Sequence, residues 1–325
     1  MTGRDGPYFE DIEVGAVVSA PGQTIDAGSR AVHRAILGDR LALAADDALA
    51  ERVTGRPGLA HPGLVWDIAI GQSSVLTRQV VANLFYRDLR FHATASAGDT
   101  LTTTTEVLAT TRARARADRP PRGKVLLRMT TRDQAGRVVL TLDRCALVRC
   151  RDGSPAAAPA AAAGEAFVAP AGLRPLTTPT WLDGWDLEPL RQGEPTPVTV
   201  GYRAELSYGD VVSSAPELAR LTGNVAAVHH DASAGGGRRL VYGGHAIGLA
   251  LGQVCRLVPG LVTVTEWFAC DHVGPVHEDD TLTTRVSVLG TEDYRDGAVL
   301  AVLHAETWAA GRRPVLDWTF VGVVA

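Results

Sequence analysis

The chain has 325 residues, enough for two domains of ordinary size, and its 46% hydrophobic and 21% charged residues are typical of a globular protein. A net charge of −4 argues against an overall nucleic-acid-binding surface. No apolar run approaches the roughly 20 residues of a membrane span, and the polar, acidic N-terminus lacks the apolar core of a signal peptide. The four cysteines show neither metal-ligand spacing nor a disulfide pattern. We therefore expect a cytoplasmic protein that does not bind nucleic acid or membranes.

Each half of the chain shows the same order of predicted elements. An amphipathic helix is expected at residues 29–37 in the first half and at 214–222 in the second. A longer apolar helix follows, at 63–76 and at 244–258. Strands run from there to the end of each half, and those of the second half are expected near 262–273, 280–290, 297–309 and 314–324. An apolar helix must bury its surface against the strands, so the pattern predicts an α+β fold, a helix wrapped by an antiparallel sheet, twice.

Two segments of the sequence repeat at a constant spacing. The motif DTLTT begins at Asp99 and again at Asp280, an offset of 181 residues. Gly63 and Gly244, at the starts of the two apolar helices, share this offset. The same offset at two separate places in the sequence indicates a tandem duplication.

A segment rich in alanine, proline and glycine separates the two halves. Residues 153–178 show no apolar periodicity, and their prolines disfavour a helix because proline lacks a backbone N–H. We therefore expect an N-terminal domain at 1–152, a linker at 153–178 and a C-terminal domain at 179–325.

Residues 221–253, LTGNVAAVHHDASAGGGRRLVYGGHAIGLALGQ, form the candidate active site. A polar pair delivered to a glycine-rich helix N-terminus is a way to present backbone N–H groups to an oxyanion. His229 is the expected proton carrier, because an imidazole can take up and return a proton near neutral pH. Asn224 cannot transfer protons, so its amide would orient a water or a carbonyl, or else cap the preceding helix.

The start of the second apolar helix supplies the remaining candidates. The Gly244 N–H is the expected oxyanion donor, although glycine there also suits close packing of a helix on a sheet. Candidates for substrate binding are Tyr242, Gly243, His245, Arg238 and Arg239. The two arginines suit a carboxylate or phosphate, with a solvated loop as the equal alternative. For His245 the alternative is a first-turn position facing solvent or core.

Histidines also occur in the loop after the first strand of the second half, which raises the question of a metal. Together with His229, the candidate ligands are Asp271, His272 and His277. They lack a tight two-histidine motif, so no metal is expected.

The sequence resembles the MaoC-like, (R)-specific enoyl-thioester hydratases of the hotdog fold. The resemblance rests on PYFEDIEVG at residues 7–15, HPGL at 61–64 and NLFYRDLRFHATASAGDTLTTTTEVL at 83–108. The family signature Gly-Asp-x-Asn-Pro-Leu-His matches GNVAAVH at 223–229, with His229 kept and Asn224 in place of the aspartate. The stretch GRRLVYGGH is most similar to the branch of mesaconyl-CoA hydratases, also called β-methylmalyl-CoA dehydratases.

The resemblance implies a double hotdog that works as a hydro-lyase on a 2-enoyl or 3-hydroxyacyl thioester. Coenzyme A, or the phosphopantetheine of an acyl carrier protein, would be the substrate handle, and no other cofactor would be needed. Ala44 stands five residues after Asp39, where the signature has histidine, so the first half would be catalytically silent.

Three alternatives stay open at this point. One is a tailoring dehydratase or a thioesterase of a biosynthetic pathway on the same fold, for which Glu266 or Asp271 would be the carboxylate. Another is a non-catalytic binding subunit. A homodimer is open too, although two hotdog units in one chain already supply the usual pairing of two central helices.

Overall fold

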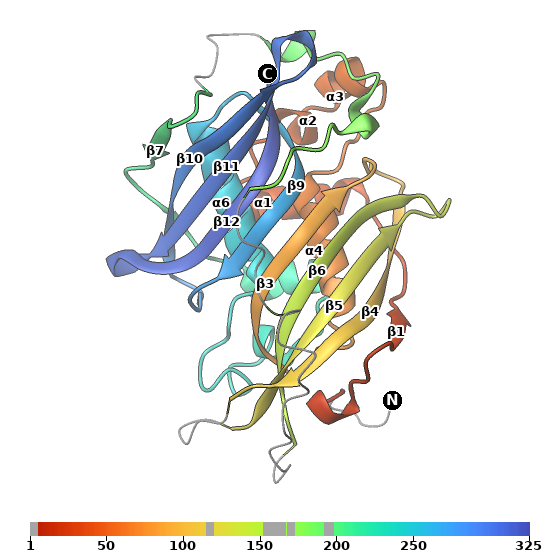
Figure 1. The fold of residues 1–325 in the computed structure, drawn as a ribbon, viewed down its shortest axis with the longest axis vertical. Helices are drawn as coiled ribbons and strands as arrows, with labels where there is room; N and C mark the ends of the chain where they lie inside the picture. The colour runs from red at the N-terminus through yellow and green to blue at the C-terminus, as the bar shows by residue number, and fades with distance from the viewer. Residues whose placement is uncertain (1–5, 115–119, 152–166, 168–172, 192–197) are drawn as a thin grey trace.

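Two long helices and a broad antiparallel sheet form the body of the molecule (Figure 1). The structure is a computed structural model, and it describes residues 6–114, 120–151, 167, 173–191 and 198–325. The predicted linker lies mostly outside these ranges, so the domain limits proposed from the sequence stay predictions. No helix in the described ranges is both long and apolar enough to cross a membrane.

The helices of the first half are α1 (Ala27–Leu37), α2 (Ala42–Ala45), α3 (Asp47–Thr54) and α4 (Pro62–Ser73). The start of α1 is fixed by Asp26, whose side chain accepts a hydrogen bond from the Ser29 N–H at 2.6 Å. The helix ends at Gly38, whose φ of 65° is a left-handed conformation that glycine adopts without strain. Every residue of α4 is buried, as expected for the apolar central helix.

The helices of the second half are α5 (Ala215–Leu221) and α6 (Gly243–Leu257). These are the amphipathic and apolar helices predicted at 214–222 and 244–258. A single 3-10 turn at Ala227–His229 lies between them.

Four long strands follow each central helix. They are β3 (Val80–Phe91), β4 (Thr100–Arg112), β5 (Arg122–Arg132) and β6 (Val138–Arg149), then β9 (Leu261–His272), β10 (Thr281–Asp293), β11 (Val299–Ala309) and β12 (Arg313–Val324). Short strands add to their edges: β1 (Val17–Ser19), β2 (Gln23–Thr24), β7 (Arg203–Glu205) and β8 (Asp210–Val211). Along the first part of β4, inward and outward residues alternate, as expected for a strand with one face on the core.

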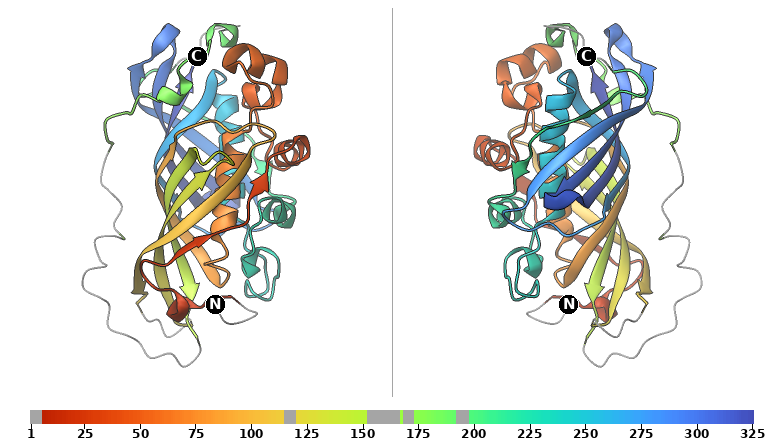
Figure 2. Two further views of the ribbon diagram at one scale, coloured as in Figure 1. Left: turned by 90° about the vertical axis from the view of Figure 1, so that its right-hand side faces the viewer. Right: turned by 90° about the vertical axis from the view of Figure 1, so that its left-hand side faces the viewer.

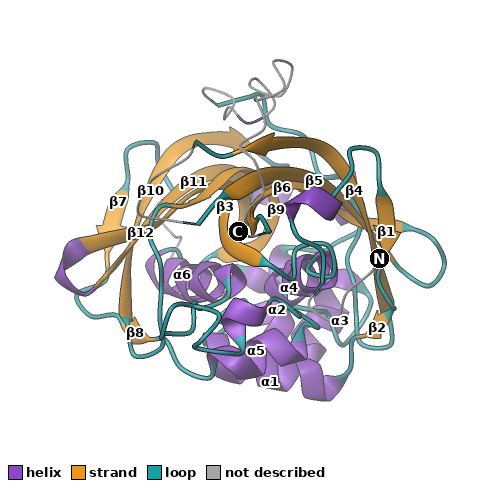
Figure 3. Cartoon of the chain, turned by 90° about the horizontal axis from the view of Figure 1, so that it is seen from below, coloured by secondary structure: helices purple, strands orange, loops and turns teal. Residues whose placement is uncertain are grey.

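The two halves share one 12-stranded sheet, in which ten strands have the order β1-β4-β5-β6-β3-β9-β12-β11-β10-β7. The other two lie off this path, where β2 pairs with β4 and β8 with β10. The centre of the sheet is the antiparallel pair β3 and β9, in which Tyr86 lies opposite Cys270 and Arg90 opposite Glu266. The helices lie on one side of this sheet (Figure 2). The sheet curves over α4 and α6, and α1 and α5 lie beyond them (Figure 3). The predicted α+β architecture, a helix wrapped by antiparallel strands twice over, is confirmed.

The loop that precedes each central helix crosses onto the central helix of the other half. A Cβ on Gly71 of α4 would lie 1.9 Å from the Thr222 carbonyl oxygen, and a Cβ on Gly252 of α6 would lie 3.1 Å from that of Gly38. Only glycine allows this approach at Gly71, because any side chain would collide with backbone. Each region beside a central helix N-terminus is therefore built from both halves.

Candidate active site

A cavity of about 250 Å³ lies where the N-terminus of α6 faces β3 and β6. The first half contributes residues of β3 and Arg144 of β6 to its walls. The second half contributes Asn224, His229, residues 240–243 and the loop after β9. Among the described residues, no aspartate or glutamate lines this cavity.

His229 lies on the cavity wall in the 3-10 turn between α5 and α6. Its Nδ1 lies 2.7 Å from the Leu240 carbonyl oxygen, which only accepts, so Nδ1 carries the proton and Nε2 has the free lone pair. Burial lowers the pKa of His229 to about 4, against the raising effect of the Leu240 bond and with help from the charge of Arg144. The imidazole is therefore neutral at pH 7 and able to accept a proton at Nε2.

Asn224 serves as both a helix-end residue and a cavity residue. Its backbone N–H donates to the Ala219 carbonyl at 2.8 Å, and Gly223 beside it has a φ of 66°, which together close the end of α5. Its side-chain Oδ1 accepts from the Ala226 N–H at 3.0 Å. The side chain lines the cavity, so the amide NH₂ group is the part that remains to donate a hydrogen bond there.

The first residues of α6 form the opposite part of the wall. Tyr242 lines the cavity, and its hydroxyl donates to the Asp67 backbone oxygen at 3.0 Å. Gly243 also lines the cavity, and a Cβ there would lie 2.6 Å from His272 Nε2. Gly244 does not line it: a Cβ there would lie 1.9 Å from an Asp67 carboxylate oxygen on α4. The glycine that faces the cavity is therefore Gly243, and Gly244 is required for helix packing.

Three residues expected to bind substrate do not line the cavity: His245, Arg238 and Arg239. His245 is completely buried behind the wall, because successive helical residues point about 100° apart, and burial lowers its pKa to about 4. Arg239 forms an ion pair with Glu278, and Arg238 is exposed. The structure thus places the arginines on a solvated loop and the histidine in the core, outside this cavity.

Arg144 is a cavity residue that the sequence analysis missed. It lies on the inner face of β6 and only 3% of it is exposed. Its Nε donates to Asn83 Oδ1 at 2.9 Å and its Nη1 to Ser73 Oγ at 2.6 Å. The other inward positions of β6 are apolar: Leu140, Leu142, Ala146 and Val148. An arginine that interrupts this alternation was a signal in the sequence.

His272, the last residue of β9, is a second residue that the sequence analysis did not assign to substrate contact. Its Nε2 is buried and has no hydrogen-bond partner among the described residues. Burial lowers the pKa of His272 to about 4, and the charge of Arg144 adds to this effect. The cavity therefore holds two neutral imidazoles and one guanidinium.

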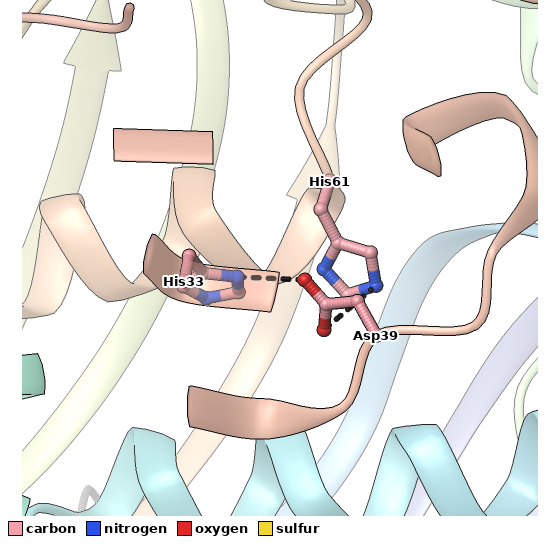
Figure 4. A group of neighbouring side chains, drawn as sticks. All are labelled: His33, Asp39 and His61. Atoms are coloured by element: carbon pink, nitrogen blue, oxygen red, sulfur yellow. Dashed lines mark hydrogen bonds and ion pairs between the residues drawn. The ribbon is translucent and has the colours of Figure 1, made fainter. Parts of the chain in front are cut away.

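A second buried cluster occupies the related position in the first half (Figure 4). Asp39, the counterpart of Asn224, has its carboxylate 2.8 Å from His33 Nδ1 and 3.4 Å from His61 Nε2. His33 Nε2 lies 3.3 Å from the Asp67 carboxylate. Burial would lower the pKa of His33, but the charges of Asp39 and Asp67 outweigh it and raise that pKa to about 9. Ala44 supplies no histidine, yet two histidines reach Asp39 from elsewhere.

Three side chains of this cluster lie close enough together to be considered as a metal site. The three candidate atoms, on His33, Asp39 and His61, lie within 4.8 Å of one another. However, the Gly63 N–H donates to His61 Nδ1 at 3.0 Å, so the neutral ring carries its proton on Nε2, the atom that faces Asp39. Burial lowers the pKa of His61 to about 4, so the ring is neutral. A protonated Nε2 offers no lone pair to a metal, so the arrangement favours a cluster of buried ionisable groups over a metal site.

Comparisons with known proteins identify relatives with the same fold. No family model matches the sequence. A mesaconyl-CoA hydratase from Cereibacter sphaeroides is 30% identical over 315 residues, which cover 93% of this chain and 89% of that protein. A conserved hypothetical protein from Mycobacterium tuberculosis, described as a double hotdog, is 45% identical with a TM-score of 0.88 over 98% of both chains. A MaoC-domain dehydratase from Chloroflexus aurantiacus is 23% identical with a TM-score of 0.82, covering 100% of this chain and 99% of that one. The predicted double hotdog fold is confirmed.

Proposed function

Because the chain belongs to the MaoC-like hydratase and dehydratase family and is therefore a hydro-lyase, we propose that it reversibly hydrates a 2-enoyl coenzyme A thioester of the mesaconyl type. The observation that carries this proposal is a cavity that no described carboxylate lines and in which the neutral His229 faces the N-terminus of α6. The resemblance of the acyl group to mesaconyl is supported by the hydratase relative, which matches 93% of the chain.

The proposed hydration uses His229 as the single proton carrier. Its Nε2 accepts a proton from water as the water oxygen bonds to Cβ of the enoyl group. The Asn224 NH₂ group donates to the water oxygen and holds it, which leaves one water proton directed at the imidazole. The imidazolium then gives its proton to Cα, so the neutral base is regenerated and one water has been added. Dehydration runs through the same steps in reverse.

The negative charge that develops on the thioester oxygen needs hydrogen-bond donors. We assign this role to the backbone at the start of α6, with the Gly243 N–H in place of the expected Gly244 N–H. The first N–H groups of a helix have no acceptor within the helix and carry partial positive charge. Removing one such donor in other enzymes costs about 10²–10³ in rate. These steps require neither a metal nor a redox cofactor.

A groove beside the cavity suits the coenzyme A handle. Val81 lines both the cavity and a neighbouring surface groove, whose other walls include Arg122, Arg149 and Arg151. Arginines at a groove attract phosphate groups, of which coenzyme A carries several. We therefore propose that the thioester enters along this groove, and we favour coenzyme A over a carrier protein.

A thioesterase is disfavoured by the positions of the two carboxylates considered for it. Glu266 pairs with Arg174 at 2.8 Å, and Asp271 pairs with Arg87 at 2.7 Å. Neither carboxylate lines the cavity. Among the described residues, the imidazoles are therefore the general bases that line the cavity. A neutral imidazole suits the addition of water to the double bond.

The proposed function is tested by incubating the purified protein with mesaconyl-CoA and crotonyl-CoA. We expect a product that is one water heavier, identified by mass spectrometry, with the thioester intact. Free coenzyme A and free acid without a hydroxyacyl thioester would contradict hydration. His229→Ala serves as the control for contaminating activity and should show no product above background.

A further inference from the structure

We propose that Arg144 binds a carboxylate on the acyl group and thereby selects dicarboxylic enoyl thioesters. This inference rests on the proposed function and adds the residue that would set substrate class. The mesaconyl group carries a carboxylate on Cβ, the carbon that receives the water oxygen. Its binding site must therefore lie in the same cavity as His229.

The first argument is the unpaired charge of Arg144. Two described arginines are buried, and they differ in their partners. Arg87 lies 2.7 Å from the Asp271 carboxylate, as a buried charge normally requires. Arg144 donates only to the neutral oxygens of Asn83 and Ser73, and within the described chain no carboxylate forms an ion pair with it. A buried cation without a counter-ion is costly unless a ligand supplies the negative charge.

The second argument is where the remaining donors lie. A guanidinium has five N–H donors in a planar fork, and the two known hydrogen bonds of Arg144 use one on Nε and one on Nη1. Nη2 is left for a partner in the cavity that Arg144 lines. Arginine matches a carboxylate in geometry as well as charge, because two parallel N–H donors meet its two oxygens.

The third argument is the sign of the charge in the cavity. No described aspartate or glutamate lines it, and the charge of Arg144 contributes to the lowered pKa of both His229 and His272. The positive potential thus reaches the reacting region. Asn224 fits this arrangement, because an aspartate at that position would place a competing anion in the same cavity as Arg144.

A binding role for Arg144 toward the thioester oxygen is the rival interpretation. That oxygen is neutral in the bound substrate and gains charge only during the reaction, and the helix N-terminus already offers donors to it. A guanidinium that must be neutralised in the resting complex fits a permanent anion better. The two interpretations differ in one respect: a carboxylate partner affects only substrates that carry one.

The kinetic test compares mesaconyl-CoA with tiglyl-CoA, which has a methyl group where mesaconyl-CoA has the carboxylate. We expect Arg144→Met to lower kcat/KM for mesaconyl-CoA about 100-fold or more, since truncating one member of a buried charge pair has effects of this size. The value for tiglyl-CoA should stay within about threefold. Arg144→Lys should recover part of the preference, because it keeps the charge but loses the fork. Equal losses on both substrates would overturn the inference and favour the thioester oxygen.

A matched control distinguishes Arg144 from the arginines first expected to bind the carboxylate. Arg238→Met removes an exposed arginine outside the cavity, so it should leave both kcat/KM values unchanged. A selective loss on mesaconyl-CoA in Arg238→Met, with none in Arg144→Met, would overturn the assignment. Thermal unfolding of each variant shows whether it folds, because Arg144→Met also leaves Asn83 Oδ1 and Ser73 Oγ without their donor.

Binding of saturated thioesters separates failure of this inference from failure of the proposed function. Succinyl-CoA and butyryl-CoA cannot be hydrated, so their affinities, measured by calorimetry, do not depend on catalysis. We expect the wild-type protein to bind succinyl-CoA at least about tenfold more tightly, and Arg144→Met to abolish the difference. No preference in the wild type would overturn the inference even if enoyl thioesters are hydrated. A preference that depends on Arg144 would sustain it even if they are not.

Discussion

The cavity at His229 and the cluster at Asp39 lie at related positions in the two halves, yet their histidines differ in their hydrogen-bond partners. His33 uses both ring nitrogens on Asp39 and Asp67, and these carboxylates raise its pKa to about 9. His229 uses only Nδ1, and burial lowers its pKa to about 4. The cluster holds more ionisable groups, and carboxylates occupy both ring nitrogens of its His33. A histidine that keeps a free nitrogen toward a cavity is a better candidate for proton transfer than one held between two carboxylates.

The two regions also meet physically at Tyr242. Its ring lines the cavity, and its hydroxyl donates to Asp67, which in turn contacts His33. The cluster therefore supports the wall of the cavity from behind. This arrangement predicts that the cavity at His229 controls catalysis and that the cluster at Asp39 controls stability.

The strongest expected effect is on catalysis, from His229→Ala. Without the proton carrier we expect kcat/KM for hydration to fall about 10³-fold, within the range known for general acid–base residues. The free energy of unfolding should change little in comparison. The measurement is steady-state kinetics beside urea denaturation, and a loss of less than tenfold in a folded variant would show that another residue moves the proton.

For Asp39→Ala we expect a large loss of stability with little loss of turnover. Removing the carboxylate leaves the His33 imidazolium with one partner fewer in a buried site, which should lower the free energy of unfolding by about 3–5 kcal/mol. Turnover per folded molecule at low temperature should stay within a few-fold. A collapse of turnover in a variant that still folds would show that the first half takes part in catalysis.

The two regions should also respond to different ranges of pH. The pKa of His33 is raised from 6.5 to about 9, so its contribution to stability is complete below pH 6.5 and is lost as pH rises through 9. From that shift, the free energy of unfolding of the wild type should fall by on the order of 3 kcal/mol more than that of His33→Asn over this pH range. Hydration activity should behave differently, because His229 with a pKa of about 4 is already neutral throughout. Urea denaturation at several pH values gives the first quantity, and kcat/KM between pH 5 and 8 gives the second.

The smallest effect is expected for Asn224→Asp, which brings the cavity closer to the family signature. The new carboxylate would lie in the same cavity as Arg144, so kcat/KM for mesaconyl-CoA should fall about tenfold. The same charge should raise the pKa of His229 and move the acid limb of the pH profile upward. An improved reaction with mesaconyl-CoA at pH 7 would contradict the view that this cavity excludes acids.

Much of the fold was predictable because its signals are local and repeated. The DTLTT repeat, the alternation in β4 and β10, and the glycine at the start of each central helix all follow from short stretches of sequence. The same stretches named His229, Asn224, Tyr242 and Gly243 as candidates, and the structure places all four at one cavity, where their roles stay predictions. Sequence proximity does not show which way a residue faces. Gly244 and His245 directly follow Gly243, yet Gly244 packs against Asp67 and His245 is buried in the core.

The rest of the site was not predictable from the second half alone. Arg144 comes from the other half and reaches the cavity because the sheet is continuous across β3 and β9. The cluster in the first half was missed for the same reason, since His33 and His61 approach Asp39 from different elements. Sequence spacing predicts which residues share an element, whereas packing between distant elements decides which residues share a cavity.

The pairing of β3 with β9 inside one polypeptide has an evolutionary consequence. In a symmetric dimer of identical hotdog subunits, every mutation would appear in both sites at once. Here the strands that meet at the centre belong to two separately inherited segments, so Arg144 alters one cavity and leaves its counterpart untouched. A single chain with two different halves can therefore carry a cavity in one half and buried ion pairs at the related position of the other, which a dimer of identical chains cannot do.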